Sequence, residues 1–345
     1  MPRPWQSEKG RLSAITPDGA LRTVGVHWRG RGCRVTECQS AISGDRPTGA
    51  GESHALRTLA GCALGLLAVV IWSGWLVITR VAVTTTLSAE DLSALRFGSG
   101  GLILLPVVWQ RGFALDRLGW RGLALIVICA GAPYVLLVSH GLRVATAAEA
   151  GVLVPGTIPL FVALLSTFTV REKIGRVAGI GLGLIVAGVA LIVIPALIAA
   201  AGWQLFGYGI CLFSAILWAA YTIEARRAGV DALHVTAIIM VISGALFVPV
   251  YLLLPAQGIW HAGWTEFWVQ LIYQGPLTGI VALLVYTRAV AILGATRASA
   301  FTALLPLSAM LLAIPVVGEC PSLRTASGAV LAASGVLLAT AFARR

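Results

Sequence analysis

The sequence is poor in charge: only 11% of its 345 residues are charged, whereas 58% are hydrophobic. Soluble domains carry about 25% charged residues, so this composition excludes an ordinary soluble protein. The formal net charge is nevertheless +11, without a basic stripe that interleaves with aromatic residues. Because basic residues of membrane proteins gather in cytoplasmic loops, we expect a lipid bilayer as surroundings and no nucleic acid as partner.

The motifs of several enzyme classes are also missing. No GxxxxGK[ST] segment is present, which excludes ATP hydrolysis by a P-loop. Neither HExxH nor GxSxG occurs, and the five histidines lie far apart. The six cysteines include no CxxC pair, which favours free thiols that act as small apolar residues. The sequence predicts no enzyme, no cofactor and no metal site.

Residues 1–55 lack any long apolar run and are rich in Arg, Gly, Ser and Thr. Without an apolar segment they cannot serve as a signal peptide. Two interpretations stay open: a disordered cytoplasmic arm, or a start codon assigned too early. No methionine lies between Met1 and Met240, so a later start would need a valine codon such as that of Val24, Val26 or Val35.

From Arg57 onward, charged residues separate apolar segments of nearly constant length. For example, 21 residues without formal charge separate Arg121 from Arg143, and another 21 separate Arg297 from Glu319. About 20 apolar residues cross the hydrocarbon core as a helix, and backbone groups in lipid must bond within their own segment. The sequence predicts an all-α polytopic membrane protein with ten transmembrane helices, at residues 59–79, 92–110, 122–141, 149–169, 177–198, 205–224, 235–254, 267–287, 298–317 and 325–342.

The loops between these spans differ in positive charge. Twelve Lys and Arg residues fall in loops on the side of the N-terminus, or in the C-terminal tail. The loops on the other side hold three, namely Arg80, Arg143 and Arg324. Because positive loops face the cytoplasm, we expect cytoplasmic N- and C-termini.

The chain contains a repeat with a shift of about 147 residues. The segment TIPLFVALLSTFTVREK, which begins at Thr157, has a later echo in LLPLSAMLLAIPVVGEC, which begins at Leu304. The matched pairs are Pro159 with Pro306, Glu172 with Glu319, Gly181 with Gly328 and Gly188 with Gly335; at a shift of 146 they are Trp72 with Trp218, Trp75 with Tyr221 and Arg80 with Arg226. We therefore expect two five-helix repeats, at residues 57–198 and 203–342. Since five is odd, the second copy crosses the membrane inverted, an arrangement typical of transporters that alternate between two open states.

Both halves resemble a known family. GLRVATAAEAGVLVPGTIPLF and AVAILGATRASAFTALLPLSA are similar to the two EamA-type domains of the drug/metabolite transporter superfamily, and LSALRF resembles the entry to that family's second helix. The resemblance covers residues 57–342 and implies an inner-membrane permease, often an exporter of amino acids or other small metabolites. We expect a secondary transporter of the inner (plasma) membrane that exports a small polar metabolite, an amino acid or a drug-like compound. Alternatives are an uptake permease and a lipid-flippase-like protein; an intramembrane enzyme is least expected, and a homodimer stays open.

Prolines and aromatic residues indicate where a substrate would bind. Pro133 and Pro276 lie inside the third and eighth predicted helices, where proline kinks a helix. Kinked helices often border a transport site, so the neighbouring Tyr134 and Gln274 are candidates. Four aromatic residues, Trp72, Trp75, Trp218 and Tyr221, occupy repeat-related places in helices 1 and 6 and either line a cavity or pack in the core.

Three ionisable residues complete the candidate set. Arg96 lies inside helix 2, and His140 and Glu149 lie near the outer ends of helices 3 and 4. Arg96 with Glu149 would clamp the carboxylate and amine of an amino acid, whereas Glu149 with His140 would pass a proton. Alternatively, all three residues and the nearby Arg143 lie at the interface and snorkel to water. We thus predict Trp72, Trp75, Arg96, Tyr134, Trp218, Tyr221 and Gln274 for substrate binding, and His140 and Glu149 for proton or charge coupling.

One stripe of small residues suggests a packing face. Gly175, Gly179 and Gly183 recur every four residues along the fifth helix. Small residues at this spacing let membrane helices approach closely. We expect this stripe to contact another helix rather than a ligand.

Overall fold

The computed structural model describes residues 9–15, 21–27, 49–169, 174–255 and 257–341. The chain divides into two units, Met1–His54 and Ala55–Arg345. Glu172, Val35, Cys33 and Cys38 lie outside the described residues. Each unit is described by itself below.

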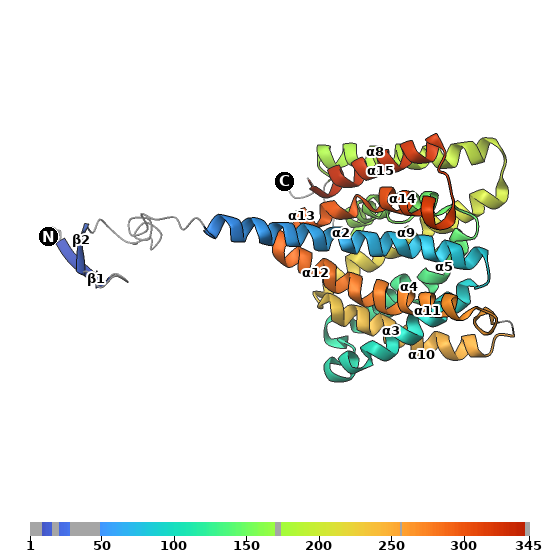
Figure 1. The fold of residues 1–345 in the computed structure, drawn as a ribbon, viewed down its shortest axis with the longest axis horizontal. Helices are drawn as coiled ribbons and strands as arrows, with labels where there is room; N and C mark the ends of the chain where they lie inside the picture. Colours follow the sequence, from blue (N-terminus) through green and yellow to red (C-terminus); the bar gives the residue numbers. More distant parts are fainter. Residues whose placement is uncertain (1–8, 16–20, 28–48, 170–173, 256, 342–345) are drawn as a thin grey trace. The chain divides into compact units, whose positions relative to one another are not determined.

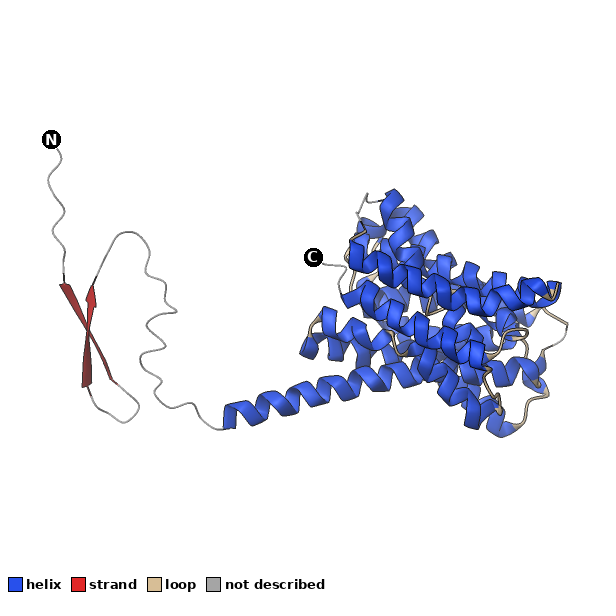
Figure 2. Cartoon of the chain, turned by 90° about the horizontal axis from the view of Figure 1, so that it is seen from above, coloured by secondary structure: helices blue, strands red, loops and turns tan. Residues whose placement is uncertain are grey.

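The first unit contains an antiparallel hairpin of β1 (Lys9–Ile15) and β2 (Leu21–His27) (Figure 2). The prediction of a disordered arm did not include these strands. Thr23, Val24 and Val26 supply the β-branched residues that favour an extended strand. A lone two-stranded hairpin is only marginally stable in water, so this element adds little to the fold of the chain.

The described residues of the second unit form helices joined by short loops, and ten helices or runs of consecutive helices are long and apolar enough to cross a membrane (Figure 2). The predicted all-α, ten-span architecture is confirmed. The spans are Leu56–Thr84, Ala89–Arg111, Leu115–Leu142, Ala147–Thr169, Arg176–Ile198, Gly202–Ala228, Ala232–Leu252, Trp264–Leu293, Arg297–Val317 and Leu323–Thr340.

Six of the spans are single helices and four are interrupted. The single helices are α2 (Gly49–Thr84), α3 (Ala89–Arg111), α8 (Arg176–Ile198), α9 (Gly202–Ala228), α10 (Ala232–Leu252) and α15 (Leu323–Ala341). The interrupted spans are built from α4 (Leu115–Ala130) and α5 (Ala132–Leu142); α6 (Ala147–Leu153) and α7 (Ile158–Thr169); α11 (Trp264–Ile272), the π-helix η2 (Tyr273–Val281) and α12 (Ala282–Leu293); and α13 (Ala295–Thr302) and α14 (Leu305–Val317). A short 3₁₀ turn, η1 (Gly258–Trp260), lies before α11.

The interruptions recur at matching places in the two repeats. Span 3 breaks at Gly131, just before Pro133, and its counterpart, span 8, becomes π-helical around Pro276. Span 4 breaks after Leu153, and its counterpart, span 9, breaks before Leu305. Proline removes a backbone donor and clashes with the preceding turn, which accounts for these breaks. The kinks predicted at Pro133 and Pro276 are therefore present.

Helices α8 and α15, the last spans of the two repeats, lie side by side (Figure 1). A Cβ built on Gly181 would meet the carbonyl oxygen of Gly335 at 2.7 Å, and one on Gly188 would meet that of Gly328 at 2.6 Å. The two backbones therefore pass each other at glycines. We call these four glycines the glycine seam.

The pairing within the glycine seam has the form of a two-fold relation. Gly181 is the repeat counterpart of Gly328, and Gly188 that of Gly335. Across the seam each glycine contacts the counterpart of the other, Gly181 with Gly335 and Gly188 with Gly328. Such crossed contacts place the helices antiparallel and relate them by a local two-fold axis, as expected for inverted copies.

The stripe of Gly175, Gly179 and Gly183 does not form the packing face, so that prediction was wrong. A Cβ on Gly175 or Gly183 would meet nothing within 4 Å, and one on Gly179 would meet only Ile174 at 4.0 Å. All three glycines are exposed on the helix surface. Spacing alone identifies a helical face, but it cannot tell which of several glycine faces finds a partner.

Two faces of the second unit are distinguished below. The distal face is the end of the bundle where span 1 ends near Thr84 and span 2 begins at Ala89. The proximal face is the opposite end, where span 1 begins and span 10 ends, because the number of spans is even.

Candidate functional site

Spans 1 and 8 meet through polar side chains inside the bundle. The Trp75 Nε1–H donates to Gln274 Oε1 at 2.8 Å, and Gln274 Nε2 donates to Thr79 Oγ1 at 3.1 Å and to Gln270 Oε1 at 3.0 Å. Gln270 Nε2 in turn donates to the carbonyl oxygen of Ile78 at 3.1 Å. Gln274 and Thr79 are fully buried. Buried amides need such partners, so this network fixes the side chain of Gln274.

Arg96 joins this network from span 2. Its Nη1 donates to the backbone carbonyl oxygen of Gln274 at 3.1 Å, and its Cζ lies 5.0 Å from the ring centroid of Trp75. This distance is within the range of a cation–π interaction. The Arg96 side chain is buried, and its Nε has no hydrogen-bond partner among the described residues.

The aromatic candidates form a continuous row. The Tyr134 ring lies 6.5 Å from that of Trp75 and 4.9 Å from that of Trp218, and Trp218 lies 5.1 Å from Tyr221. These centroid distances are typical of favourable aromatic pairs. We call Trp75, Arg96, Tyr134, Trp218, Tyr221 and Gln274 the central cluster; the structure brings these six predicted residues together from spans 1, 2, 3, 6 and 8.

The seventh predicted binding residue, Trp72, has a different neighbour. Its ring lies 5.2 Å from that of Tyr286 in α12, with an interplanar angle of 56°. Trp72 and Trp75 are three residues apart on α2, so they lie on neighbouring positions of one helical face. Trp72 therefore contacts span 8 and is not part of the row.

In the described part of the chain, no hydrogen bond or ion pair joins the two residues predicted for coupling to each other or to Arg96. His140 Nε2 lies 3.3 Å from Glu90 Oε1, and both side chains are about one-third exposed. Glu149 accepts from the backbone N–H of Thr146 at 2.9 Å and from the Tyr208 hydroxyl at 2.7 Å. Glu149 thus completes a capping box at the start of α6. Neither the predicted Arg96–Glu149 clamp nor the predicted His140–Glu149 relay is formed in this conformation, because each group has another partner.

A network at the distal face was missed by the sequence reasoning. Arg80 Nε donates to Glu319 Oε1 at 2.9 Å, and Arg80 Nη1 donates to the carbonyl oxygen of Leu142 at 2.6 Å. The other oxygen of Glu319 accepts from the backbone N–H of Ala147 at 2.9 Å. We call Arg80, Glu319, Leu142 and Ala147 the distal latch; it ties together the ends of spans 1, 3, 4 and 9. The available signal was that the two opposite charges fall on the same side of the predicted topology.

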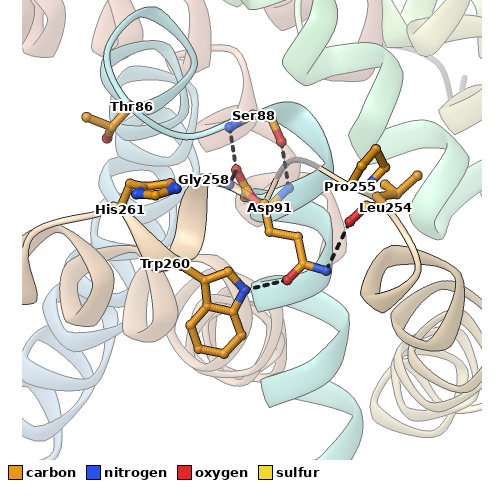
Figure 3. Close-up of a pocket in the computed structure, with 9 residues that line it drawn as sticks. Thr86, Ser88, Asp91, Leu254, Pro255, Gly258, Trp260 and His261 are labelled. Carbon is orange, nitrogen blue, oxygen red and sulfur yellow. Dashed lines mark hydrogen bonds between the residues drawn. The ribbon is translucent and has the colours of Figure 1, made fainter.

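The loop after span 7 forms a pocket at the distal face. Its volume is about 660 Å³, and Asp91, Gly258, Trp260 and His261 are among the residues that line it (Figure 3). Asp91 is fully buried and accepts from the Gly258 N–H at 3.2 Å and the Tyr251 hydroxyl at 2.5 Å. The carboxylate is therefore saturated by bonds that hold the loop against spans 2 and 7.

The two halves of the chain, residues 59–194 and 205–341, each match the model of the EamA-like transporter family. The chain belongs to the EamA-like transporter family. The matched segments agree with the two five-span repeats of the structure. Members of this family are transporters, so the chain is a multi-pass membrane transporter and not an enzyme. In the described part of this EamA-like transporter, no group of three or more His, Cys, Asp or Glu side chains could hold a metal ion.

Individual relatives agree with this assignment. An uncharacterized transporter from Archaeoglobus fulgidus is 26% identical over 280 residues, which cover 80% of this chain and 95% of the relative. A second from Acidianus ambivalens is 32% identical over 187 residues, covering 54% of this chain and 68% of the relative. A solved crystal structure aligns with 83% of this chain and 98% of its own at a TM-score of 0.55 and 24% identity. That similarity shows the fold alone.

Proposed function

We propose that this EamA-like transporter is a secondary transporter that exports a small polar metabolite by alternating access. Inverted repeats can exchange conformations, so that one arrangement opens the centre to one side and the other opens it to the opposite side. The crossed contacts of the glycine seam, in which Gly181 meets Gly335 and Gly188 meets Gly328, support such an exchange about a local two-fold axis.

The distal latch is the observation that carries this proposal. Arg80 and Glu319 are each less than one-fifth exposed and join four span ends at one face. The repeat counterpart of Arg80 at the proximal face is Arg226, which is exposed. In this proposal the distal latch closes the distal face in the conformation described, and the alternate state releases it.

The proximal face is assigned to the cytoplasm in this proposal. It carries Arg111, Arg117, Arg121, Arg226, Arg227, Arg288 and Arg297 at or near its span ends, whereas the distal face carries Arg80, Arg143 and Arg324. Positive loops remain on the cytoplasmic side during insertion. A transporter closed at the outer face with its central cluster behind the latch would load substrate from the cytoplasm, which agrees with export.

The central cluster is the proposed binding region. Measured along the helices, Trp75 and Gln274 lie about 14–15 Å from the distal ends of spans 1 and 8, near the middle of a core about 30 Å thick. Amide and guanidinium groups there supply polar contacts, and the row of aromatic rings supplies an apolar wall. Sites at the midplane between repeats are the rule for inverted-repeat transporters.

Metabolite profiling of cells that overexpress the full chain tests this function. The comparison uses empty vector and the Gln274→Leu variant, which removes the amide at the centre of the polar network. A compound that accumulates outside cells with the wild type, but not with Gln274→Leu, is the expected result. A compound depleted from the medium would instead favour uptake, and a change confined to lipid distribution between leaflets would favour a flippase-like role. No difference from empty vector in metabolites or lipids would contradict the transport proposal.

A further inference from the structure

Arg96 is a charge buried within the membrane. It is the eighth residue of the second span, Ala89–Arg111, and so lies about 10 Å along the helix from the distal end. The residue is 8% exposed. A guanidinium at this depth is costly unless a partner of opposite charge compensates it, and such residues usually mark a substrate or ion pathway.

The contacts of Arg96 do not neutralise its charge. Nη1 donates to the backbone carbonyl of Gln274, and the guanidinium faces the Trp75 ring at 5.0 Å. Both partners are formally neutral. Nε is buried and has no hydrogen-bond partner among the described residues. An unpaired buried donor on a charged group loses its hydration without replacement.

The carboxylates near Arg96 in the sequence are occupied elsewhere. Glu90 lies against His140, and Asp91 accepts bonds from Gly258 and Tyr251. None of the ion pairs in the described part of the chain includes Arg96. Among the described residues, the buried positive charge of Arg96 therefore has no anionic partner.

We propose that Arg96 is the anchor for the carboxylate of an organic monoanion that this protein transports. This inference rests on the transport function proposed above and names its substrate class. An Arg guanidinium binds a carboxylate through two parallel N–H donors, and the free Nε–H offers one of them. A carboxylate with one oxygen against Nε would accept the hydrogen bond of the unpaired Nε–H, and its negative charge would compensate that of Arg96.

The surroundings of Arg96 restrict the ligand further. The central cluster contains one cation, Arg96. Arg80, outside the cluster, is already paired with Glu319. A single positive charge matches a monoanion better than a phosphate monoester with two charges. The amine of a zwitterion would need an acidic partner, and Glu149 is held by Thr146 and Tyr208. The aromatic row from Trp75 through Tyr134 offers an apolar wall for the rest of the molecule.

Matched acids and amides test the proposal. Purified full-length protein in lipid nanodiscs is titrated with benzoate against benzamide, and with hexanoate against hexanamide, while its melting temperature is followed. Each pair has nearly the same shape and differs in charge. We expect the acids to raise the melting temperature and to bind at least tenfold more tightly than the amides. This comparison on the wild type requires no variant.

Variants then locate the binding site. Arg96→Gln should lose the rise in melting temperature with both acids. Arg96→Lys should keep a smaller rise, because the positive charge stays while the two parallel donors of the guanidinium are lost. Arg324→Gln removes an exposed positive charge at the same face and should respond like the wild type. The proposal is overturned if neither acid binds more tightly than its amide, or if Arg96→Gln binds the acids as the wild type does.

Counterflow in proteoliposomes separates this inference from the transport function. If acids bind in an Arg96-dependent way but no labelled acid crosses the membrane, the binding site stands and the transport proposal fails. If a neutral or cationic compound is transported equally by wild type and Arg96→Gln, transport stands and the carboxylate anchor fails.

Discussion

The glycine seam and the central cluster differ in how the two repeats contribute. In the seam, Gly181 faces Gly335 and Gly188 faces Gly328, so both halves supply the same residue type. In the cluster, the counterparts of Arg96 and Gln274, at the shift of 143 that pairs Pro133 with Pro276, are Ile239 and Gly131. Residues that occur in both repeats thus form the contact and the two-fold relation between the repeats. The polar residues of the cluster, Arg96 and Gln274, occur in one repeat only.

The largest effect is expected in the seam. Gly181→Leu places a side chain where a Cβ already approaches the Gly335 carbonyl oxygen at 2.7 Å, so helices α8 and α15 must separate. Overpacking costs about 1–3 kcal/mol and occasionally more, and a rigid backbone cannot yield as a side chain does. We expect loss of most monodisperse protein in size-exclusion chromatography.

Gly183→Leu is the matched control, because its Cβ would meet nothing within 4 Å on the same helix. It should be recovered like the wild type. Equal yields of monodisperse Gly181→Leu and Gly183→Leu protein would contradict the claim that the glycine seam holds the repeats together.

The second effect concerns the distal latch. Glu319→Gln removes the charge that pairs with Arg80 at 2.9 Å, and breaking a largely buried ion pair leaves the other charge uncompensated. We expect the distal face to open more often. With the remaining cysteines replaced, the buried Cys211 of α9 should then react about tenfold faster or more with a membrane-impermeant maleimide, a change of about 1.4 kcal/mol in opening.

The charge-reversed double variant Arg80→Glu with Glu319→Arg should slow this reaction again, because an ion pair is restored. A reaction rate for Cys211 that is unchanged in Glu319→Gln would contradict the assignment of the latch as a closure.

A third, intermediate effect is expected in the central cluster. Gln274→Leu leaves Trp75 Nε1 and Thr79 without their amide partner, at a cost of about 1–3 kcal/mol for buried groups left unpaired. We expect the folded protein to be recovered with a lower melting temperature, and transport to fall by about tenfold or more. Gln257→Leu in the distal loop pocket is the control and should transport normally. Wild-type transport by the Gln274→Leu variant would contradict the proposal that the substrate binds at the central cluster.

The smallest effect is expected at Glu149. Glu149→Gln keeps an oxygen for the Thr146 N–H but loses the negative charge at the start of α6. Such capping charges contribute about 0.3–1 kcal/mol, so the melting temperature should fall slightly and transport should stay within about twofold. If transport instead lost its dependence on a proton gradient in this variant, Glu149 would be a coupling residue and not a cap.

The sequence predicted the elements that repeat or that depend on local chemistry. Span positions followed from apolar length, the inverted relation from the odd number of helices per copy, and the breaks near Pro133 and Pro276 from the missing backbone donor. Six predicted binding residues lie together, and ring contacts join Trp75 to Tyr134 and Tyr134 to Trp218.

Pairings between distant side chains were not predictable in the same way. Hydropathy gives the depth of Glu149 but not the direction of its side chain, which turns to Thr146 and Tyr208 instead of Arg96. Likewise, the spacing of Gly175, Gly179 and Gly183 marks a face of α8, but the rotation of that helix in the bundle decides whether the face meets a neighbour. Rotation and pairing come from tertiary packing.

The central claim is that the repeats alternate and that the distal latch must open in each cycle. Its most direct test is counterflow by a variant with cysteines at positions 80 and 319, in a background free of other cysteines, before and after treatment with short bifunctional methanethiosulfonates. The two single-cysteine variants, treated identically, are controls. Transport should stop only in the cross-linked double variant and return on reduction. Undiminished transport with the cross-link verified would contradict the account.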